Sequence, residues 1–416
     1  MKTYNCDVMV GGGGPGGICA AVSAARNGAD TLLVERYGYL GGMATAGLVF
    51  PFMTRFAGSE RIIDGIFQEI IERLDAKGGY GGPGKPYQFN AELLKVVADE
   101  ICLESGVRIL LHTSVASTKA ADGRIKEVIV SNKSGEASVK AAMYVDATGD
   151  ADISYLSGVP CEKGRTSDGL TQPMTLNFRM ANVDTDRMPD SKTITEMYLK
   201  AREQGRIDCP RNDILAFEAM RDREIHFNTT RIICADGTNA EDLTKAEIDS
   251  RRQMRQIANW IRSDVPGFEN AYVQISGEQI GIRESRRIVG EYVMTAEDIR
   301  GARKFEDCIA RGSYPVDIHD PKGGGTQMES LKPGESYDIP YRSIVPKVID
   351  NLLVAGRPIS STHEAHSAIR IMPIAAAIGE AAGATAALCV KQGTTPRDLA
   401  YDDLRQALLA QGANLG

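Results

Sequence analysis

The chain has few residues of the kinds that build metal clusters or disulfide frameworks. Among its 416 residues are eight cysteines, five histidines and one tryptophan. The cysteines are scattered and form no CxxC pair, which argues against a zinc site, an iron-sulfur cluster and a dithiol redox centre. We therefore expect no bound metal, and we expect most cysteines to be buried as small apolar side chains.

An excess of positive charge and long apolar runs are also missing. The formal net charge is -7, which gives no basic surface for nucleic acid. The N-terminus, MKTYNCDVMV, has no apolar stretch of signal length, and no later segment crosses a bilayer without a charge or a glycine break. These absences predict a cytoplasmic protein without a membrane span. The length, with 43% hydrophobic and 25% charged residues, suits two globular domains.

The most informative segment is DVMVGGGGPGGICAAVSAARNGADTLLVE, residues 7–35. Its pattern predicts a buried strand at residues 7–10, a helix at 17–27 and a second strand at 29–34. The glycines between strand and helix allow a sharp turn, close contact of the main chain with a pyrophosphate, and tight packing of helix on strand. Because the helix also begins with unpaired N–H groups, the segment is typical of a dinucleotide-binding unit.

Two registers of the GxGxxG pattern fit this turn: Gly11, Gly13 and Gly16, or Gly12, Gly14 and Gly17. We favour the second, because Pro15 then lies just inside the start of the helix. Glu35 closes the second strand, 18 residues after Gly17, where a carboxylate accepts hydrogen bonds from both ribose hydroxyls and disfavours a 2′-phosphate. A further match lacks the strand and helix on either side and is expected to be a loop: Gly79, Gly81 and Gly84.

The rest of the chain has two styles. Strands and helices alternate up to residue 157 and again after residue 341, as expected for a parallel sheet. Residues 158–340 instead mix longer polar helices with strand-like pieces at 229–235 and 271–276. We expect an α/β protein in which a Rossmann-like cofactor-binding domain, residues 1–157 and 341–416, is interleaved with a mixed α+β substrate domain, residues 158–340.

Four blocks, taken in their order, resemble the FAD-dependent oxidoreductases of the glutathione-reductase-like superfamily, and in particular a bacterial family of mostly unassigned members. The blocks are VGGGGPGG with ERYGYLGGMAT, VDATGDADIS, GIRESRRIVGEYVMTAEDI, and NLLVAGRPISSTHEAHSAIRIMPIAAAIGEAAG. They span nearly the whole chain. The order and spacing of four blocks are far more specific than one glycine motif, so the resemblance implies that the cofactor is FAD and that the first domain is a Rossmann-like FAD-binding domain.

The resemblance also implies which residues contact FAD. They are Gly12, Gly14, Pro15, Gly16 and Gly17 at the pyrophosphate, Glu35 and Arg36 at the adenosine ribose, Gly42, Met43 and Thr45 near the ribityl chain, Val115 at adenine, Thr148, Gly149 and Asp150 in a second turn, Gly356 and Arg357 near the ribityl-pyrophosphate region, and Arg370, Ile371 and Met372 before a helix. The positive end of that helix would face N1 and O2 of the flavin, where a preorganised dipole stabilises negative charge.

Three residues are candidates for the chemistry itself. His363 and His366 lie in the block expected nearest the flavin ring, and an imidazole there can take a proton that leaves with a hydride. A buried, hydrogen-bonded histidine is an equally good interpretation. The HEAH spacing is one residue short of the HExxH metal motif. Arg283, in a group of three arginines, is a candidate to hold a substrate carboxylate, although ion pairs explain such groups more often.

The sequence thus predicts an FAD-dependent oxidoreductase that transfers hydride between a small organic substrate and flavin N5. No second dinucleotide motif has the right context, so the other electron partner stays open among oxygen, a quinone, a protein carrier and NAD(P)H. An NAD-dependent dehydrogenase on the same fold is an alternative that leaves the ATGD and AGR segments without a role. A non-catalytic flavin-binding component of a larger complex is another.

Overall fold

The largest sheet of the described residues has seven strands. The computed structural model describes residues 1–81 and 87–416, so Gly84 of the third glycine match lies outside the described residues. The strand order is β5-β2-β1-β8-β7-β6, and β19 also pairs with β8. The strands are β1 (Lys2–Gly11), β2 (Thr31–Val34), β5 (Arg108–Leu110), β6 (Thr113–Ala121), β7 (Arg124–Asn132), β8 (Gly135–Asp146) and β19 (Leu352–Val354).

The part of this sheet that carries the glycine turn is parallel. β1 pairs in parallel with β2 and β8, β2 with β5, and β19 with β8, whereas β6 and β7 form an antiparallel extension. All four residues of β2 are buried, as expected for a parallel strand covered on both faces. The predicted α/β, Rossmann-like class is therefore confirmed. In chain order the sheet joins residues 2–146 to residues 352–354.

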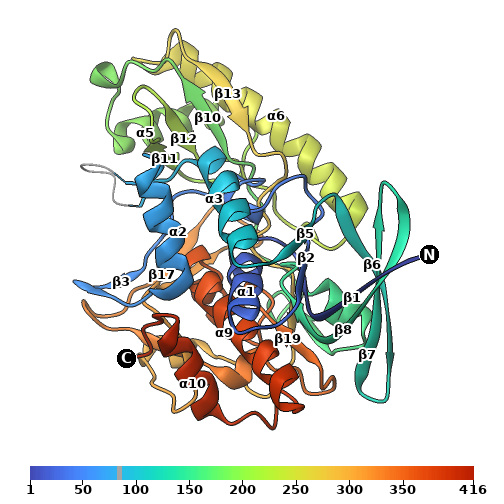
Figure 1. The fold of residues 1–416 in the computed structure, drawn as a ribbon. Coiled ribbons are helices and arrows are strands. Elements are labelled where there is room, and N and C mark those ends of the chain that lie inside the picture. Colours follow the sequence, from blue (N-terminus) through green and yellow to red (C-terminus); the bar gives the residue numbers. More distant parts are fainter. Residues whose placement is uncertain (82–86) are drawn as a thin grey trace.

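Two helices, α1 (Pro15–Arg26) and α9 (Met372–Gln392), lie side by side at the centre of the molecule (Figure 1). Small residues let them approach, because a Cβ atom added at Gly383 would lie 2.0 Å from the carbonyl oxygen of Ala20. Among the described helices, α9 is long and apolar enough to cross a membrane, yet 83% of its apolar window is buried inside the protein. It is a buried core helix.

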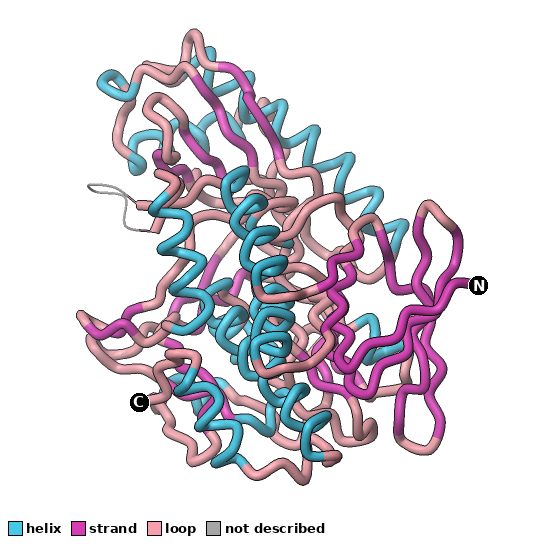
Figure 2. The backbone as a smooth tube through the Cα atoms, viewed as in Figure 1, coloured by secondary structure: helices cyan, strands magenta, loops and turns pink. Residues whose placement is uncertain are grey.

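A second, smaller sheet lies in the upper lobe of Figures 1 and 2. Its strands are antiparallel in the order β11 (Ala216–Glu218), β12 (Ile225–Phe227), β10 (Phe178–Ala181) and β13 (Tyr272–Ser276). Two helices pack with it, α5 (Ser191–Glu203) and the long α6 (Ala240–Asp264). Phe178, Phe227 and Trp260 belong to a core of its own.

The strand predicted at residues 229–235 is wrong. The segment has only an isolated bridge, between Ile232 and Met174. The buried polar side chains of this segment bond instead to backbone that is distant in the chain: the hydroxyl of Thr229 donates to the carbonyl of Leu215, and that of Thr230 donates to the carbonyl of Leu176. The next residue, Arg231, is also buried, with 1% of its surface exposed. Polar burial thus imitates a strand pattern here.

The remaining elements belong to neither of these two sheets. Residues between Ile288 and Tyr341 pack into the same core as the seven-stranded sheet, although they lie in the chain region expected for the substrate domain. The other helices and strands are α2 (Gly65–Ala76), α3 (Ala91–Glu104), α4 (Asp152–Leu156), α7 (Ala296–Arg300), α8 (His363–Ile369), α10 (Tyr401–Ala410), β3 (Phe56–Ala57), β4 (Glu60–Arg61), β9 (Cys161–Lys163), β14 (Arg286–Ile288), β15 (Cys308–Gly312), β16 (Val316–His319), β17 (Thr326–Glu329) and β18 (Tyr337–Pro340).

Candidate functional site

A cavity of about 270 Å³ lies where the carboxyl ends of the parallel strands meet the N-termini of α1 and α9. This edge is where open α/β sheets bind their ligands. Most residues expected to contact a cofactor line it: Gly12, Gly14, Pro15, Gly16, Glu35, Arg36, Gly42, Met43, Val115, Thr148, Gly149, Gly356, Arg357, Arg370 and Met372. The structure therefore brings together six separate segments of the chain.

Eight further residues line the cavity without having been predicted: Val34, Tyr37, Thr113, Ser114, Ala147, Asp152, Ala355 and Ala375. Most of them are chain neighbours of predicted residues, so extending each motif by one or two positions would have found them. Val115 lies inside the antiparallel strand β6. Four expected residues are not in the lining: Gly17, Thr45, Asp150 and Ile371.

Three glycines in and after the turn that follows β1 have different structural roles. Gly12 has φ +100°, and a Cβ there would lie 2.3 Å from the carbonyl oxygen of Ala147. A Cβ at Gly17 would lie 1.7 Å from the carbonyl oxygen of Gly12, so this residue lets the helix pack on the turn. Gly14 is the N-cap residue of α1, where it offers no side chain to cap the helix, and it lines the cavity. This geometry is that of the Gly12, Gly14, Gly17 register.

Glu35 ties the turn to the end of β2. Its Oε2 accepts from the N–H of Gly13 at 2.6 Å, and its Oε1 accepts from the N–H of Tyr37 at 2.9 Å. The residue is 4% exposed and lines the cavity. Each carboxylate oxygen has a second lone pair, so the group can also accept from a ligand. Arg36, beside it, donates to Oε1 of Gln279 at 2.8 Å.

Asp150 acts through Arg357. Its Oδ1 lies 2.9 Å from Nη2 of Arg357 and accepts from the hydroxyl of Ser285 at 2.7 Å. Arg357 lines the cavity, and its Nη1 is buried with no hydrogen-bond partner among the described residues. An unpaired guanidinium nitrogen at a cavity wall fits an anionic group such as a pyrophosphate. Asp150 therefore positions the arginine.

The N-terminus of α9 forms the opposite wall. Met372 and Ala375 line the cavity, no side chain caps the helix, and its first turn contains no acidic residue. Its positive end is therefore free to face an electron-rich ligand. Arg370, just before the helix, lines the same wall, and its buried Nε has no partner in the described part of the chain.

Two other residues that were expected to contact FAD support the walls of the cavity without lining it. The hydroxyl of Thr45 donates to the carbonyl of Leu40 at 3.0 Å and so fixes the turn η1 (Gly42–Ala44). Ile371 is the N-cap residue of α9. Asp152, at the start of α4, lines the cavity, and burial, followed by the negative charges of Asp150 and Asp146, raises its pKa to about 6.

The two candidate histidines lie next to this cavity but not in its lining. Nδ1 of His363 is 2.9 Å from Oε1 of Glu284, and its Nε2 is buried without a partner among the described residues. Glu284 also accepts from Arg287. Burial and nearby arginines lower the pKa of His366 well below its usual value, so this imidazole is neutral. Glu284, which sequence reasoning missed, links the arginine group to the histidine block.

Arg283 lies deeper in the protein. Its Nη1 donates to the carbonyl of Pro173 at 2.8 Å and to Oγ1 of Thr175 at 2.6 Å, and its Nη2 donates to Oδ1 of Asn228 at 3.1 Å. The residue is 8% exposed. Burial first, and then the positive charges of Arg370, Arg211 and Arg231, lower its pKa well below the usual value. It therefore belongs to a buried group of arginines and not to a solvated surface.

Parallel strands, a glycine turn and two helix N-termini around one cavity define an α/β dinucleotide-binding protein. The family described as FAD dependent oxidoreductase matches residues 7–408, and the chain belongs to this family. The protein is therefore a flavoprotein whose cofactor is FAD. The residues fit this cofactor, since backbone approaches the cavity at Gly14 and two arginines present unpaired nitrogens near it.

Similarities to individual proteins are more distant. The chain spans about half the length of the curated relatives it matches: thiamine thiazole synthase from Methanococcus vannielii is 29% identical over 149 residues, or 35% of this chain and 52% of that protein. A geranylgeranyl bacteriochlorophyll reductase-like protein from Thermoplasma acidophilum has a TM-score of 0.49 at 15% identity, covering 99% of this chain and 85% of that one. For p-nitrophenol 4-monooxygenase from Pseudomonas putida the TM-score is 0.48 at 12% identity, covering 98% and 84%.

Proposed function

We propose that the protein transfers hydride between a carbon atom of a small organic substrate and N5 of its flavin. The observation that carries this is the position of Arg370. It lines the cofactor cavity, and its Nη2 is 3.8 Å from Oδ2 of the buried Asp317, which comes from β16. A polar side chain from the middle of the chain therefore lies beside a residue of the cofactor cavity. A substrate-binding region next to a redox cofactor needs such a position.

Within the cavity, we assign the pyrophosphate to the N-terminus of α1 and to Arg357, and the adenosine ribose to Glu35. The strand segment at Val115 would take the adenine. Met372 and the N-terminus of α9 would then face the N1 and O2 edge of the flavin, where their dipole stabilises negative charge. FAD supplies the two-electron chemistry, and the protein supplies binding, orientation and charge.

Oxidation of an alcohol or amine carbon also releases a proton, which needs an acceptor. We assign this role to His363, because Glu284 bonds its Nδ1 and leaves Nε2 unpaired. A carboxylate on one ring nitrogen orients an imidazole for proton transfer at the other. His366, kept neutral by burial, is an alternative acceptor. Electrons leave to an external acceptor, for which oxygen, a quinone, a protein carrier and NAD(P)⁺ are the candidate classes.

We further place the protein in the glutathione-reductase-like superfamily and in the cytoplasm, with neither nucleic acid nor membrane as a partner. The strand order β5-β2-β1-β8, with β19 added to β8, supports the first assignment. The net charge of -7 supports the absence of nucleic acid.

Anaerobic reduction of the flavin tests the proposed function. The purified protein should be yellow, and oxidised enzyme mixed with panels of hydroxy acids, amines and sugars should bleach with one of them. Histidine variant His363→Asn should retain FAD and its visible spectrum but reduce more slowly, with a changed pH profile. If the flavin responds to no compound in either redox direction, a non-catalytic flavin-binding role replaces the enzymatic one.

A further inference from the structure

Four arginines that are far apart in the chain lie near one another in the interior, and one of them, Arg370, lines the cofactor cavity. Arg211 precedes β11, Arg231 follows β12, Arg283 precedes β14 and Arg370 lies between α8 and α9. The first three are 3%, 1% and 8% exposed. Burial, and after it the positive charges of the other three, lower the pKa of Arg283, so the four guanidinium groups lie in one neighbourhood.

The negative charges around this arginine cluster do not balance it. Asp213, which pairs with Arg211 at 2.8 Å, has a side chain that is 50% exposed. Asp320, the other acidic group near Arg231, is 48% exposed. Asp317 is the acid buried with the cluster, at 3.8 Å from Arg370. Solvent screens the first two, so the interior retains an excess of positive charge.

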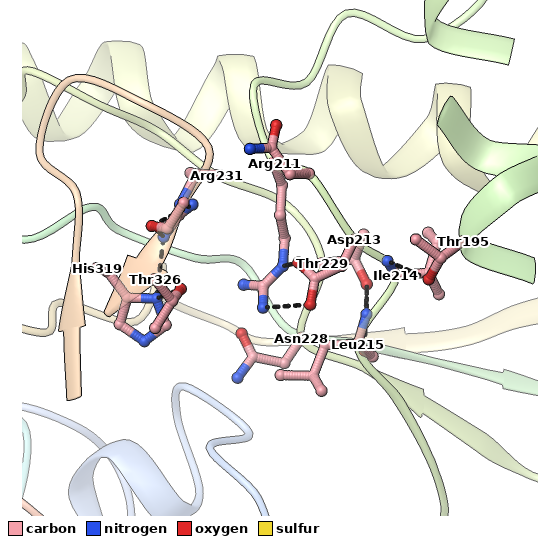
Figure 3. A network of polar contacts seen from close by, with 12 residues as sticks. Thr195, Arg211, Asp213, Ile214, Leu215, Asn228, Thr229, Arg231, His319 and Thr326 are labelled. Atoms are coloured by element: carbon pink, nitrogen blue, oxygen red, sulfur yellow. Dashed lines mark hydrogen bonds and ion pairs between the residues drawn. The ribbon is translucent and has the colours of Figure 1, made fainter. Parts of the chain in front are cut away.

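The histidine in the cluster adds no charge. Nδ1 of His319 lies 2.9 Å from Nη2 of Arg231 and 3.0 Å from the hydroxyl of Thr326 (Figure 3). Because a guanidinium group only donates, Nδ1 is the acceptor and the ring proton lies on Nε2, on the side of Asp317. Burial and then the positive charge of Arg283 lower the pKa of His319 to about 3. The ring therefore acts as a neutral acceptor that holds Arg231 in place.

Several donors of the cluster have nothing to bond to. Four buried nitrogens have no partner among the described residues: Nη1 of Arg211, Nε of Arg231, Nε of Arg370 and Nε2 of Gln172. Gln172 joins the cluster because its Oε1 accepts from the N–H of His319 at 3.4 Å. In Figure 3 the free nitrogen of Arg211 points away from Asp213, toward the side on which Arg231 and His319 lie. Unpaired buried donors are costly, and several together fit a ligand rich in acceptors.

We propose that this cluster binds the oxyanionic end of the substrate, so that the enzyme acts on a small organic acid or on a phosphate monoester. Guanidinium forks match both groups, since each offers oxygens that accept two parallel hydrogen bonds. Arg370 connects the cluster to the cofactor cavity, so a bound anion would present the rest of the molecule toward the flavin. This inference rests on the proposed oxidoreductase function and names its substrate class.

Binding of simple anions to the oxidised holoenzyme tests the inference without turnover. Succinate, benzoate and inorganic phosphate are titrated while the flavin difference spectrum and the thermal midpoint are followed. We expect at least one to bind. Arg211→Gln and Arg231→Gln should weaken its binding about tenfold or more, as expected for loss of a charge-assisted hydrogen bond. The ratio of carboxylate to phosphate affinity decides between the two sources of the oxyanion.

A matched control removes an arginine from the same lobe. Arg187 is exposed and pairs with Glu269, so Arg187→Gln should bind the anion as the wild type does. If the cluster variants do not fold, the wild type still decides, because succinamide, the neutral diamide of succinate, must bind far more weakly than succinate. Equal binding of acid and amide, or equal affinity in the cluster variants and the control, overturns the inference.

The two proposals fail separately. A flavin that is reduced only by neutral compounds, in a protein that binds no anion, overturns the arginine site and leaves the oxidoreductase function in place. A protein that binds anions through Arg211 and Arg231 but whose flavin no compound reduces retains the site and loses the proposed hydride transfer.

Discussion

A Cβ atom at Gly379 of α9 would lie 1.9 Å from the carbonyl oxygen of Gly16 in α1, so the two helices touch backbone to backbone at this point. Gly16 also lines the cofactor cavity. The α1–α9 contact at this point and the cofactor wall are therefore the same structure, and a change in one must alter the other.

Alanine at either glycine of α9 should separate the helices. Gly379→Ala and Gly383→Ala should each lower the free energy of unfolding by about 1–3 kcal/mol, because the new methyl group meets backbone and not a flexible side chain. Urea unfolding measures this. Gly325→Ala is the control, since nothing lies within 4 Å of its added Cβ. Gly379→Ala should in addition lose FAD, and an unchanged unfolding midpoint would contradict the packing described here.

Gly14 and Gly17 should respond differently to alanine. Gly14 has φ -73° and ψ -178°, an extended conformation open to any residue, and its added Cβ would meet only the Cα of Gly42 at 3.8 Å. Gly14→Ala should leave apoprotein stability within about 0.5 kcal/mol while weakening FAD binding about tenfold, because the methyl group enters the cavity. Gly17→Ala should instead destabilise the apoprotein itself. Titration of apoprotein with FAD, beside urea unfolding, separates the two effects.

Arg357 should contribute to cofactor affinity through its unpaired nitrogen. Arg357→Gln should raise the dissociation constant of FAD by about ten- to a hundredfold, the loss expected for a charge-assisted hydrogen bond of about 1.5–3 kcal/mol. Asp150→Asn should have a smaller effect in the same direction, because Asp150 only positions the arginine. Arg342→Gln is the control, since Arg342 is exposed and pairs with Asp307. Equal affinities in Arg357→Gln and this control would remove the arginine from the site.

Glu380 should make stability depend on pH. It is buried in α9, where its Oε2 accepts from the N–H of Ile66 at 3.0 Å, and burial raises its pKa to about 8 from 4.5. The folded state thus favours the protonated form. The associated stability is complete below about pH 4.5 and is lost as the pH rises through 8.

Glu380→Gln should remove much of this dependence. Wild type and variant should differ little near pH 5, and by about pH 9 the variant should be more stable by about 2–5 kcal/mol, at about 1.4 kcal/mol per pKa unit. Urea unfolding at both pH values measures the difference. The surface variant Glu297→Gln should follow the wild type, and a parallel pH profile for Glu380→Gln would mean that Glu380 is ionised in the fold.

The sequence allowed the local parts of the fold to be predicted, but not the contacts between segments that are distant in the chain. The turn at Gly12 and Gly14 could be predicted because each glycine answers a local steric requirement. The strand expected at residues 229–235 failed because the sequence does not show that Thr229 and Thr230 bond to distant backbone. Asp150 was placed at the cofactor because motifs do not distinguish a residue that lines a cavity from one that holds its neighbour.

The arginine cluster illustrates the same limit more strongly. Arg283 was singled out from a local group of arginines, but Arg211, Arg231 and Asp317 carry no local signal. Together with Arg283 they come from four separate segments, and only the tertiary fold brings their charges together. Glu284 was missed for a related reason. Its partner Arg287 is close in the chain, but its partner His363 is 79 residues away and meets it only in the folded protein.

The cofactor wall that begins at Ala355 closes a cavity whose first wall is Gly12. During synthesis, the glycine turn leaves the ribosome long before β19 can add its edge to β8 or α9 can press against α1. A nascent or truncated chain that stops before residue 350 thus lacks part of the cofactor-binding site and should stay colourless. Uptake of FAD is then a late event that requires residues 355–375.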